Sequence, residues 1–233
     1  AAGIKKVSAG RWRLALACIG LIGFTAIGLK TRIFPDSDIV TITLLLSVLI
    51  LPAFSGMGLL ASEHSAGTFK HLLAQPIPRW KLLLSKVGMG LMSYTAPILV
   101  TCAVVCLTVG GRELPAARLF ATYMAFSAFG MLVLAWSLLI GIRCRREDLY
   151  ILVNIAVLVA WCVQGLIVDE FELTRRLGQW VWNMNPFALI ELLDGPKPTA
   201  QECLRVVVVQ GVVLLGLGYG IWLRFKRINR RRS

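Results

Sequence analysis

Six long runs of apolar residues alternate with shorter polar segments along this chain of 233 residues. Most of the runs reach the roughly 20 residues that an α-helix needs to cross a hydrocarbon core about 30 Å thick. Because lipid offers the peptide backbone no hydrogen-bond partners, we expect each run to be a transmembrane helix. The runs cover residues 14–29, 39–62, 87–111, 119–142, 149–168 and 206–223. The pattern predicts an all-α, polytopic membrane protein with six transmembrane helices in a single domain, residues 1–233.

Composition and charge support this interpretation and orient the chain. Hydrophobic residues make up 57% of the sequence, which leaves too little polar surface for a soluble domain. If the N-terminus is cytoplasmic, 17 of the 25 Lys and Arg residues lie in cytoplasmic segments. The positive-inside rule therefore predicts that both termini are cytoplasmic. The basic tail after the last run is expected to lie near anionic lipid headgroups, and we expect no nucleic-acid binding despite the net charge of +13.

The chain carries few groups that could supply energy or catalysis. None of the six runs contains an Asp, Glu, Lys, Arg or His, and the sequence has no GxxxxGK[ST] phosphate-binding loop. The two histidines, His64 and His71, are not part of an HExxH motif, and Cys102 and Cys106 are expected to pack in a helix interface. We therefore predict no catalytic residue, no metal site and no cofactor bound by this chain.

A basic amphipathic segment, residues 63–80, separates the second run from the third. Residues 67–74 form a short helix candidate, on which Phe69, Leu72 and Leu73 share one face. Prolines at 76 and 78 end this helix, and Pro78 is well placed to begin another helix that continues into the third run. From the residues alone, the short helix either docks a partner protein or lies in the lipid headgroups.

This segment resembles the signature of type-2 ABC transporter permeases. The resemblance rests on Glu63, Gly67-Thr68, Leu72-Leu73, Pro76 and Arg79, followed by Lys86 at the head of the third run. The six-run plan and the long loop between the last two runs are also similar to this family, so nearly the whole chain is covered. The sequence of residues 73–80 is most similar to the branch that includes the nitrous-oxide-reductase maturation permease.

The resemblance implies a permease subunit in a bacterial or archaeal cytoplasmic membrane. Such a subunit is not an enzyme itself. It pairs with a second permease copy and docks two separate cytoplasmic ATPase subunits, which bind ATP and Mg. The resemblance assigns the ATPase-docking role, in a coupling helix and its flanks, to Glu63, Gly67, Thr68, Phe69, Leu72, Leu73, Pro76 and Arg79.

The loop over residues 169–205 has a helical pattern of its own. Its apolar residues recur at helical spacing up to a break at Asn185-Pro186, and a second apolar patch follows. Short re-entrant external helices occupy this position in the family. The resemblance therefore implies an outer gate, for which the candidates are Trp180, Trp182, Pro186 and Phe187. The alternative is a loop that anchors in lipid and gates nothing.

Polar residues inside the runs are the remaining candidates for a transport path. They are Thr41 and Ser55 in the second run, where Pro52 is able to kink the helix and is also a candidate, and Asn154 and Gln164 in the fifth. Such residues often form hydrogen bonds between transmembrane helices, but the family builds its central path from the second and fifth spans of both copies. The function implied is ATP-driven export of an unidentified substrate. The alternative is a mechanical transmission module that drives a partner protein, such as a periplasmic or extracellular one, without passing a substrate.

Overall fold

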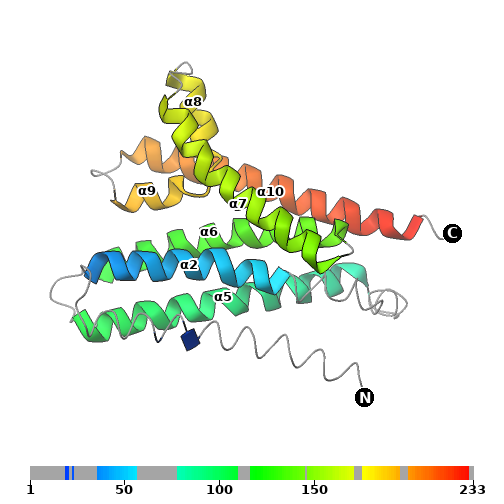
Figure 1. The fold of residues 1–233 in the computed structure, drawn as a ribbon, viewed down its shortest axis with the longest axis horizontal. Helices are drawn as coiled ribbons and strands as arrows, with labels where there is room; N and C mark the ends of the chain where they lie inside the picture. Colours follow the sequence, from blue (N-terminus) through cyan, green and yellow to red (C-terminus); the bar gives the residue numbers. More distant parts are fainter. Residues whose placement is uncertain are drawn as a thin grey trace.

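The computed structural model describes residues 19, 20, 23, 36–56, 78–109, 116–144, 146–170, 175–194 and 199–230. All regular elements in these residues are helices, which agrees with the all-α prediction. Figure 1 shows them in chain order: α2 (Asp36–Gly56), α5 (Arg79–Val109), α6 (Ala116–Arg143), α7 (Glu147–Glu170), α8 (Arg175–Asn183), α9 (Ala188–Asp194) and α10 (Ala200–Arg230).

Four of the described helices contain stretches that are long and apolar enough to cross a membrane. These stretches are Trp80–Ala103 in α5, Phe120–Arg143 in α6, Glu147–Gln164 in α7 and Ala200–Arg224 in α10. The apolar part of α2, Ile42–Gly56, is shorter, because the second predicted run continues past Gly56 into residues outside the described ranges. Most of the first predicted run also lies outside them. The described helices thus support a membrane protein, and the count of six spans stays a prediction.

Two helix starts have clear local causes. The carbonyl oxygen of Pro78 accepts hydrogen bonds from the backbone amides of Lys81 (2.9 Å) and Leu82 (3.3 Å), so α5 begins directly after this proline, as the sequence predicts. At α10, the amide of Thr199 donates to Glu202 Oε2 (2.8 Å) and the amide of Glu202 donates to Thr199 Oγ1 (3.3 Å). This reciprocal capping box starts α10 at Ala200, earlier than the apolar run that begins at residue 206.

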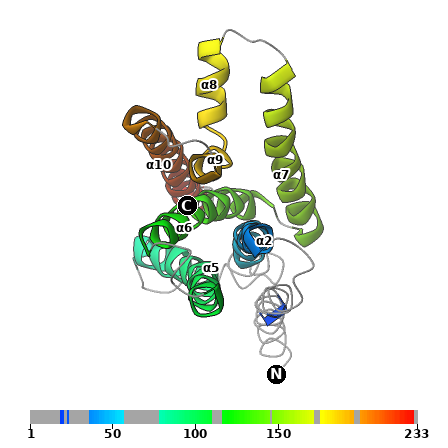
Figure 2. The same cartoon turned by 90° about the vertical axis from the view of Figure 1, so that its left-hand side faces the viewer.

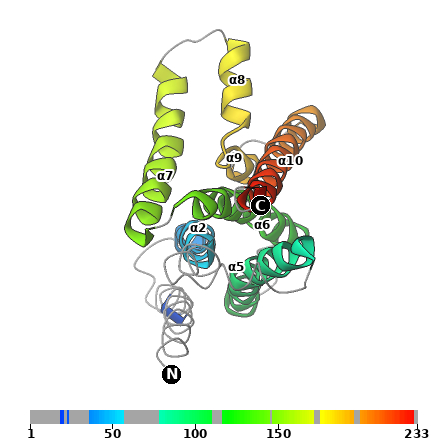
Figure 3. The same cartoon turned by 90° about the vertical axis from the view of Figure 1, so that its right-hand side faces the viewer.

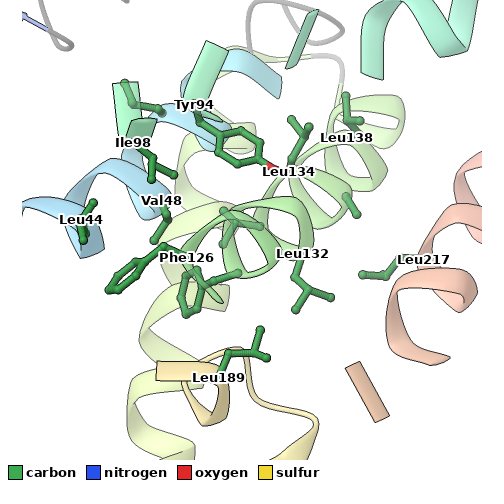
Figure 4. Close-up of a cluster of buried hydrophobic side chains, with 14 of the residues drawn as sticks. Leu44, Val48, Tyr94, Ile98, Phe126, Leu132, Leu134, Leu138, Leu189 and Leu217 are labelled. Atoms are coloured by element: carbon green, nitrogen blue, oxygen red, sulfur yellow. The ribbon is translucent and has the colours of Figure 1, made fainter. Parts of the chain in front are cut away.

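The core of the molecule is formed by α2, α5 and α6, which pack side by side, with α9 and α10 against α6 (Figures 2 and 3). Apolar side chains from these helices interdigitate in one cluster (Figure 4). Its most deeply buried members are Leu44, Val48, Leu51, Tyr94, Ile98, Phe129, Leu134 and Leu138. The α6 helix is central, because it packs against α2 and α5 as well as against α9 and α10.

A glycine allows the close approach of α5 and α6. A Cβ atom at Gly130 would lie 2.6 Å from Cε2 and 2.8 Å from Cδ2 of the Tyr94 ring. The ring therefore lies against the bare backbone of α6, and Tyr94 Oη donates a hydrogen bond to the carbonyl of Ser127 at 3.1 Å. By contrast, a Cβ atom at Gly216 in α10 would meet nothing within 4 Å, and one at Gly220 would make only an ordinary contact, 3.8 Å from Cδ1 of Leu139 in α6, so the GxxxG pattern there mediates no comparably close approach to the described helices.

The α7 helix stands apart from this core. Figures 2 and 3 show α7 and α8 extending away from α2, α5 and α6. Along its length α7 exposes large apolar side chains, namely Leu149, Ile151, Leu152, Ile155, Val159 and Val163. In a membrane protein such a surface faces lipid or another transmembrane helix.

Candidate functional site

The predicted ATPase-docking residues lie almost entirely outside the described ranges. These residues are Glu63, Gly67, Thr68, Phe69, Leu72, Leu73 and Pro76. Arg79 is the first residue of α5, but its side chain is not described. The docking surface therefore stays a prediction from the sequence.

Of the path candidates in α2, Ser55 is the best defined. Its side chain is buried, donates to the carbonyl of Leu51 at 2.7 Å and is in hydrogen-bonding contact with the hydroxyl of Ser93 in α5. Pro52 is also buried, and the side chain of Thr41 is not described. Ser55 thus lies within the packing of its own subunit, between α2 and α5.

Two further hydroxyl residues of α2 were missed by the sequence reasoning. Thr43 and Ser47 are both buried, and Ser47 Oγ donates to the carbonyl of Thr43 at 2.7 Å. Together with Ser55 they form what we call the α2 hydroxyl row, at spacings of four and eight residues. This spacing places all three on one helix face and could have identified them.

Asn154 belongs to a polar seam that joins three helices. We use this name for Ser137 of α6 and for Tyr150 and Asn154 of α7. Ser137 Oγ donates to Asn154 Oδ1 (2.8 Å), Asn154 Nδ2 donates to the carbonyl of Tyr150 (2.9 Å), and Tyr150 Oη donates to the carbonyl of Ala53 in α2 (2.8 Å).

The seam is closed tightly at Gly56, where a Cβ atom would lie 2.6 Å from Tyr150 Oη and 2.9 Å from the Cβ of Ser137. A larger residue at this position would push α7 and α6 away from α2. Tyr150 was not among the sequence candidates, although it lies four residues before Asn154 on the same face of the helix.

Gln164, the second candidate in α7, lies in the later turns of the helix and contacts α8. Its Nε2 donates to the carbonyl of Val181 in α8 at 2.8 Å. The structure therefore does not bring Gln164 together with Ser55 and Asn154. It joins Gln164 to the outer gate candidates, which follow in sequence.

Residues 183–187, which we call the outer turn, connect α8 to α9 where the sequence predicts a break. Asn185 is fully buried. Its Nδ2 donates to the carbonyl of Trp161 in α7 (2.8 Å), and its Oδ1 accepts the amide of Phe187 (3.1 Å). From α10, Gln210 Nε2 donates to the carbonyls of Asn183 (2.7 Å) and Asn185 (2.8 Å).

Neither amide residue was predicted to have a role. The sequence predicts only a helix break at Asn185, and Gln210 is a single Gln in the last apolar run. That isolation is the signal that could have found Gln210, because an amide inside a membrane span needs hydrogen-bond partners.

The four gate candidates divide between two environments. Trp180 is 51% exposed, which suits a residue at a membrane–water interface. The other three face the bundle: Pro186 is buried, Trp182 Nε1 donates to the carboxylate of Glu191, and the Phe187 ring meets Phe129 of α6 edge-on, with ring centroids 5.2 Å apart. Phe187, Ala188 and Leu189 thus pack residues 187–194 against α6.

The chemistry of these groups is that of neutral hydrogen bonding. Within the described ranges, no three His, Cys, Asp or Glu side chains gather as metal ligands would. The α2 hydroxyl row, the polar seam and the outer turn present only hydroxyl, amide and carbonyl groups. The charged Lys86, which the sequence placed outside the third run, is continuous with it in α5 and only 5% exposed.

Comparison with known proteins agrees with this architecture. The model of a family described as ABC-2 family transporter protein matches residues 15–228. The match includes the segment 63–80, the polar seam and the outer turn. No curated protein matches the chain, and the narrower branch suggested by residues 73–80 therefore stays a prediction.

Proposed function

Because the chain belongs to the ABC-2 family of transporter proteins, we propose that it is a permease subunit that couples ATP hydrolysis on separate cytoplasmic ATPase subunits to export of a substrate. The observation that carries the proposal is the family match over residues 15–228, which takes in the apolar stretches of the four described helices that are long enough to cross a membrane. Membership of this family makes the chain a membrane subunit of an ABC transporter. The substrate and the direction of transport belong to the proposal.

The neutral character of the polar seam and the α2 hydroxyl row supports an external source of energy. The buried ionisable residue Lys86 belongs to neither group and lies near the start of α5. Carriers that are driven by protons or ions usually keep ionisable residues within the membrane to bind the coupling ion. Here the polar seam and the α2 hydroxyl row offer only neutral groups. We therefore assign the energy source to ATP and Mg on the partner ATPase, with no cofactor on this chain.

The proposed assembly contains a second permease copy. The exposed apolar face of α7, with Ile151, Ile155 and Val159, is available to meet α2 or α7 of that copy. In this arrangement the path runs between the two subunits. Both residues are buried in the described conformation, so Asn154 would reach the path only when α7 parts from α2 and α6, and Ser55 only when α2 parts from α5.

Reconstitution tests the function directly. Purified permease in lipid vesicles should be inert under an imposed pH gradient and should become active only with its ATPase and ATP. As the substrate is unidentified, the readout is stimulation of ATP hydrolysis by the permease-containing vesicles over ATPase alone. Recovery of the ATPase without any such stimulation would contradict the coupling proposal, and uphill transport without ATP would contradict the energy source.

A substitution in the coupling segment tests docking. Leu72→Asp would place a charge in an apolar groove and should weaken association with the ATPase by about 2 kcal/mol or more. Leu72→Met, which keeps the volume and polarity, is the matched control. The measurement is co-purification of the ATPase with each variant at equal membrane insertion. Equal recovery with both variants would remove the docking role of this face.

A mechanical transmission module is the second candidate function. It is favoured by the complete burial of the polar seam, since a module that only drives a partner protein needs no path to open. The test uses Ser55→Cys and Asn154→Cys, each in a background that lacks the six native Cys. Labelling by a membrane-impermeant thiol reagent during ATP turnover supports a path. Protection at both sites, with changing reactivity of Trp182→Cys, supports transmission.

A further inference from the structure

Two exposed arginines stand at the ends of neighbouring helices on the side of the bundle predicted to be cytoplasmic. Arg143 is the last residue of α6, and Arg224 ends the apolar stretch of α10. We propose that these two arginines together bind the phosphate group of one anionic phospholipid between α6 and α10. The inference goes beyond the transport function proposed above, because lipid binding requires neither ATP nor the ATPase.

The packing of α10 along α6 sets the register of the two helices (Figures 2 and 3). Near their outer ends, Phe129 of α6 and Gln210 of α10 both contact the outer turn. The same number of residues further along each helix, Leu139 lies beside Gly220, where a Cβ atom would be 3.8 Å from the leucine Cδ1. The two helices are therefore parallel and in register.

This register brings the two arginines to one level. Arg143 follows Leu139 by four residues, and Arg224 follows Gly220 by four, so each arginine lies on the face that its helix turns toward the other. One such step is about 6 Å along the helix. Ile142 and Ile221 are buried in the shared apolar cluster, so the helices still pack together directly before the arginines.

Two positive charges on facing sides of packed helices repel each other. Within the described ranges neither Arg143 nor Arg224 has a carboxylate partner, and the nearby Asp148 lies 3.7 Å from a third arginine, Arg146. An anion that both guanidinium groups contact would therefore stabilise the arrangement. The planar guanidinium group donates pairs of hydrogen bonds that match the oxygens of a phosphate.

The position of the arginines favours a phospholipid as the source of this phosphate. The stretches that are apolar enough to cross a membrane end at Arg143 in α6 and at Arg224 in α10, which is the level of the lipid headgroups. Tyr219 and Trp222 of α10 are exposed and stacked on each other just before this level, as is typical of side chains at a membrane–water interface. Basic sites between transmembrane helices on the cytoplasmic side bind anionic headgroups.

Native mass spectrometry of the purified chain, titrated with phosphatidylglycerol, tests the proposal. Arg143→Gln and Arg224→Gln should each weaken the binding of one lipid by about fivefold or more. Because both arginines contact the same phosphate, the double variant should lose one bound lipid and not two. Arg146→Gln is the matched control, since Arg146 is an exposed arginine at the same end that is paired with Asp148. Loss of two lipids from the double variant, or an equal loss in the control, would overturn the proposal.

Two further measurements decide the matter if a glutamine variant fails to fold. The double variant Arg143→Lys with Arg224→Lys keeps both charges and should still bind the lipid, more weakly than the parent. The parent itself should retain phosphatidylglycerol in preference to the zwitterionic phosphatidylcholine, and added inorganic phosphate should not displace it. Equal retention of the two lipids would overturn the proposal. Displacement by inorganic phosphate would assign the site to free phosphate and overturn it as well.

Discussion

At the scale of single residues, we expect a substitution to destabilise this bundle most where the side chain holds two helices together. Ser47, Ser55 and Thr95 donate to carbonyls four residues earlier in their own helices, so these three bonds stabilise no contact between helices. Tyr150 and Gly130 are different. The hydroxyl of Tyr150 bonds α7 to α2, and the missing side chain of Gly130 admits the ring of Tyr94.

Removal of the Tyr150 hydroxyl should weaken the polar seam. Tyr150→Phe loses the 2.8 Å bond to the carbonyl of Ala53 and leaves that part of α2 without its cross-helix partner. We expect a loss of about 1 kcal/mol in the free energy of unfolding, measured as a lower melting temperature in detergent. Tyr219→Phe is the control, since Tyr219 is 62% exposed. Equal melting temperatures for both variants would show that the seam contributes no stability.

A methyl group at Gly130 should be costly, in contrast to one in α10. Gly130→Ala would place a Cβ 2.6 Å from the Tyr94 ring, and such overpacking costs about 1–3 kcal/mol. At Gly218 the same change meets no atom within 4 Å, so the higher helix propensity of alanine should stabilise the protein by up to about 1 kcal/mol. Thermal unfolding of the two variants checks the opposite signs. A neutral Gly130→Ala would mean that α5 and α6 can separate at no cost.

At the scale of the helix, the sequence predicted what depends on local patterns. Long apolar runs marked the positions of α5, α6, α7 and α10, and Asn185-Pro186 marked the break between α8 and α9. It placed the start of α10 too late, because residues 200–205 include Gln201, Glu202 and Arg205 and fall outside the apolar run, whereas the capping box starts the helix before them. A hydropathy pattern records burial in lipid, and it does not record where a helix continues into water.

The capping box should control the outer end of α10. Thr199→Ala removes the hydroxyl that accepts the Glu202 amide at 3.3 Å, with an expected local cost of about 1 kcal/mol. Hydrogen exchange at residues 200–205 should become faster, while exchange near residue 217 stays slow. Gln201→Ala, which keeps both capping residues, is the control. Unchanged exchange in Thr199→Ala would show that tertiary contacts alone fix this end.

At the scale of the whole molecule, the sequence identified the class of protein but not which helices its polar residues join, and the path-lining role of these residues stays a prediction. Ser55, Asn154 and Gln164 were expected to line one path, yet Gln164 lies with the outer turn and the other two lie in separate packed contacts. Helical periodicity predicts which residues share one face of a helix, but it does not predict which other helix packs against that face. That pairing depends on the tertiary arrangement of α2, α6 and α7.

The orientation of the molecule follows from its charge and can be measured. Seventeen of the 25 Lys and Arg residues lie in segments predicted to be cytoplasmic. In a background without native Cys, Ser233→Cys should react with an impermeant thiol reagent only when the cytoplasmic side is accessible. Thr199→Cys, at an exposed position before α10, should react only from the opposite side. The reverse pattern would place segment 63–80 outside the cell and exclude its docking to a cytoplasmic ATPase.

The separation of α7 from the central bundle has a consequence for how the protein is made. The core helices α2, α5 and α6 are complete by Arg143, so their side chains can interlock while the later helices are still being synthesised. The tight fit of Tyr94 against Gly130 belongs to this early stage. Tyr150 and Asn154 of α7 can then form their hydrogen bonds to α2 and α6 after these helices have packed together. The structure therefore predicts that assembly begins with an inner scaffold of α2, α5 and α6 and continues with the helices that are synthesised after it, first α7 and last α10.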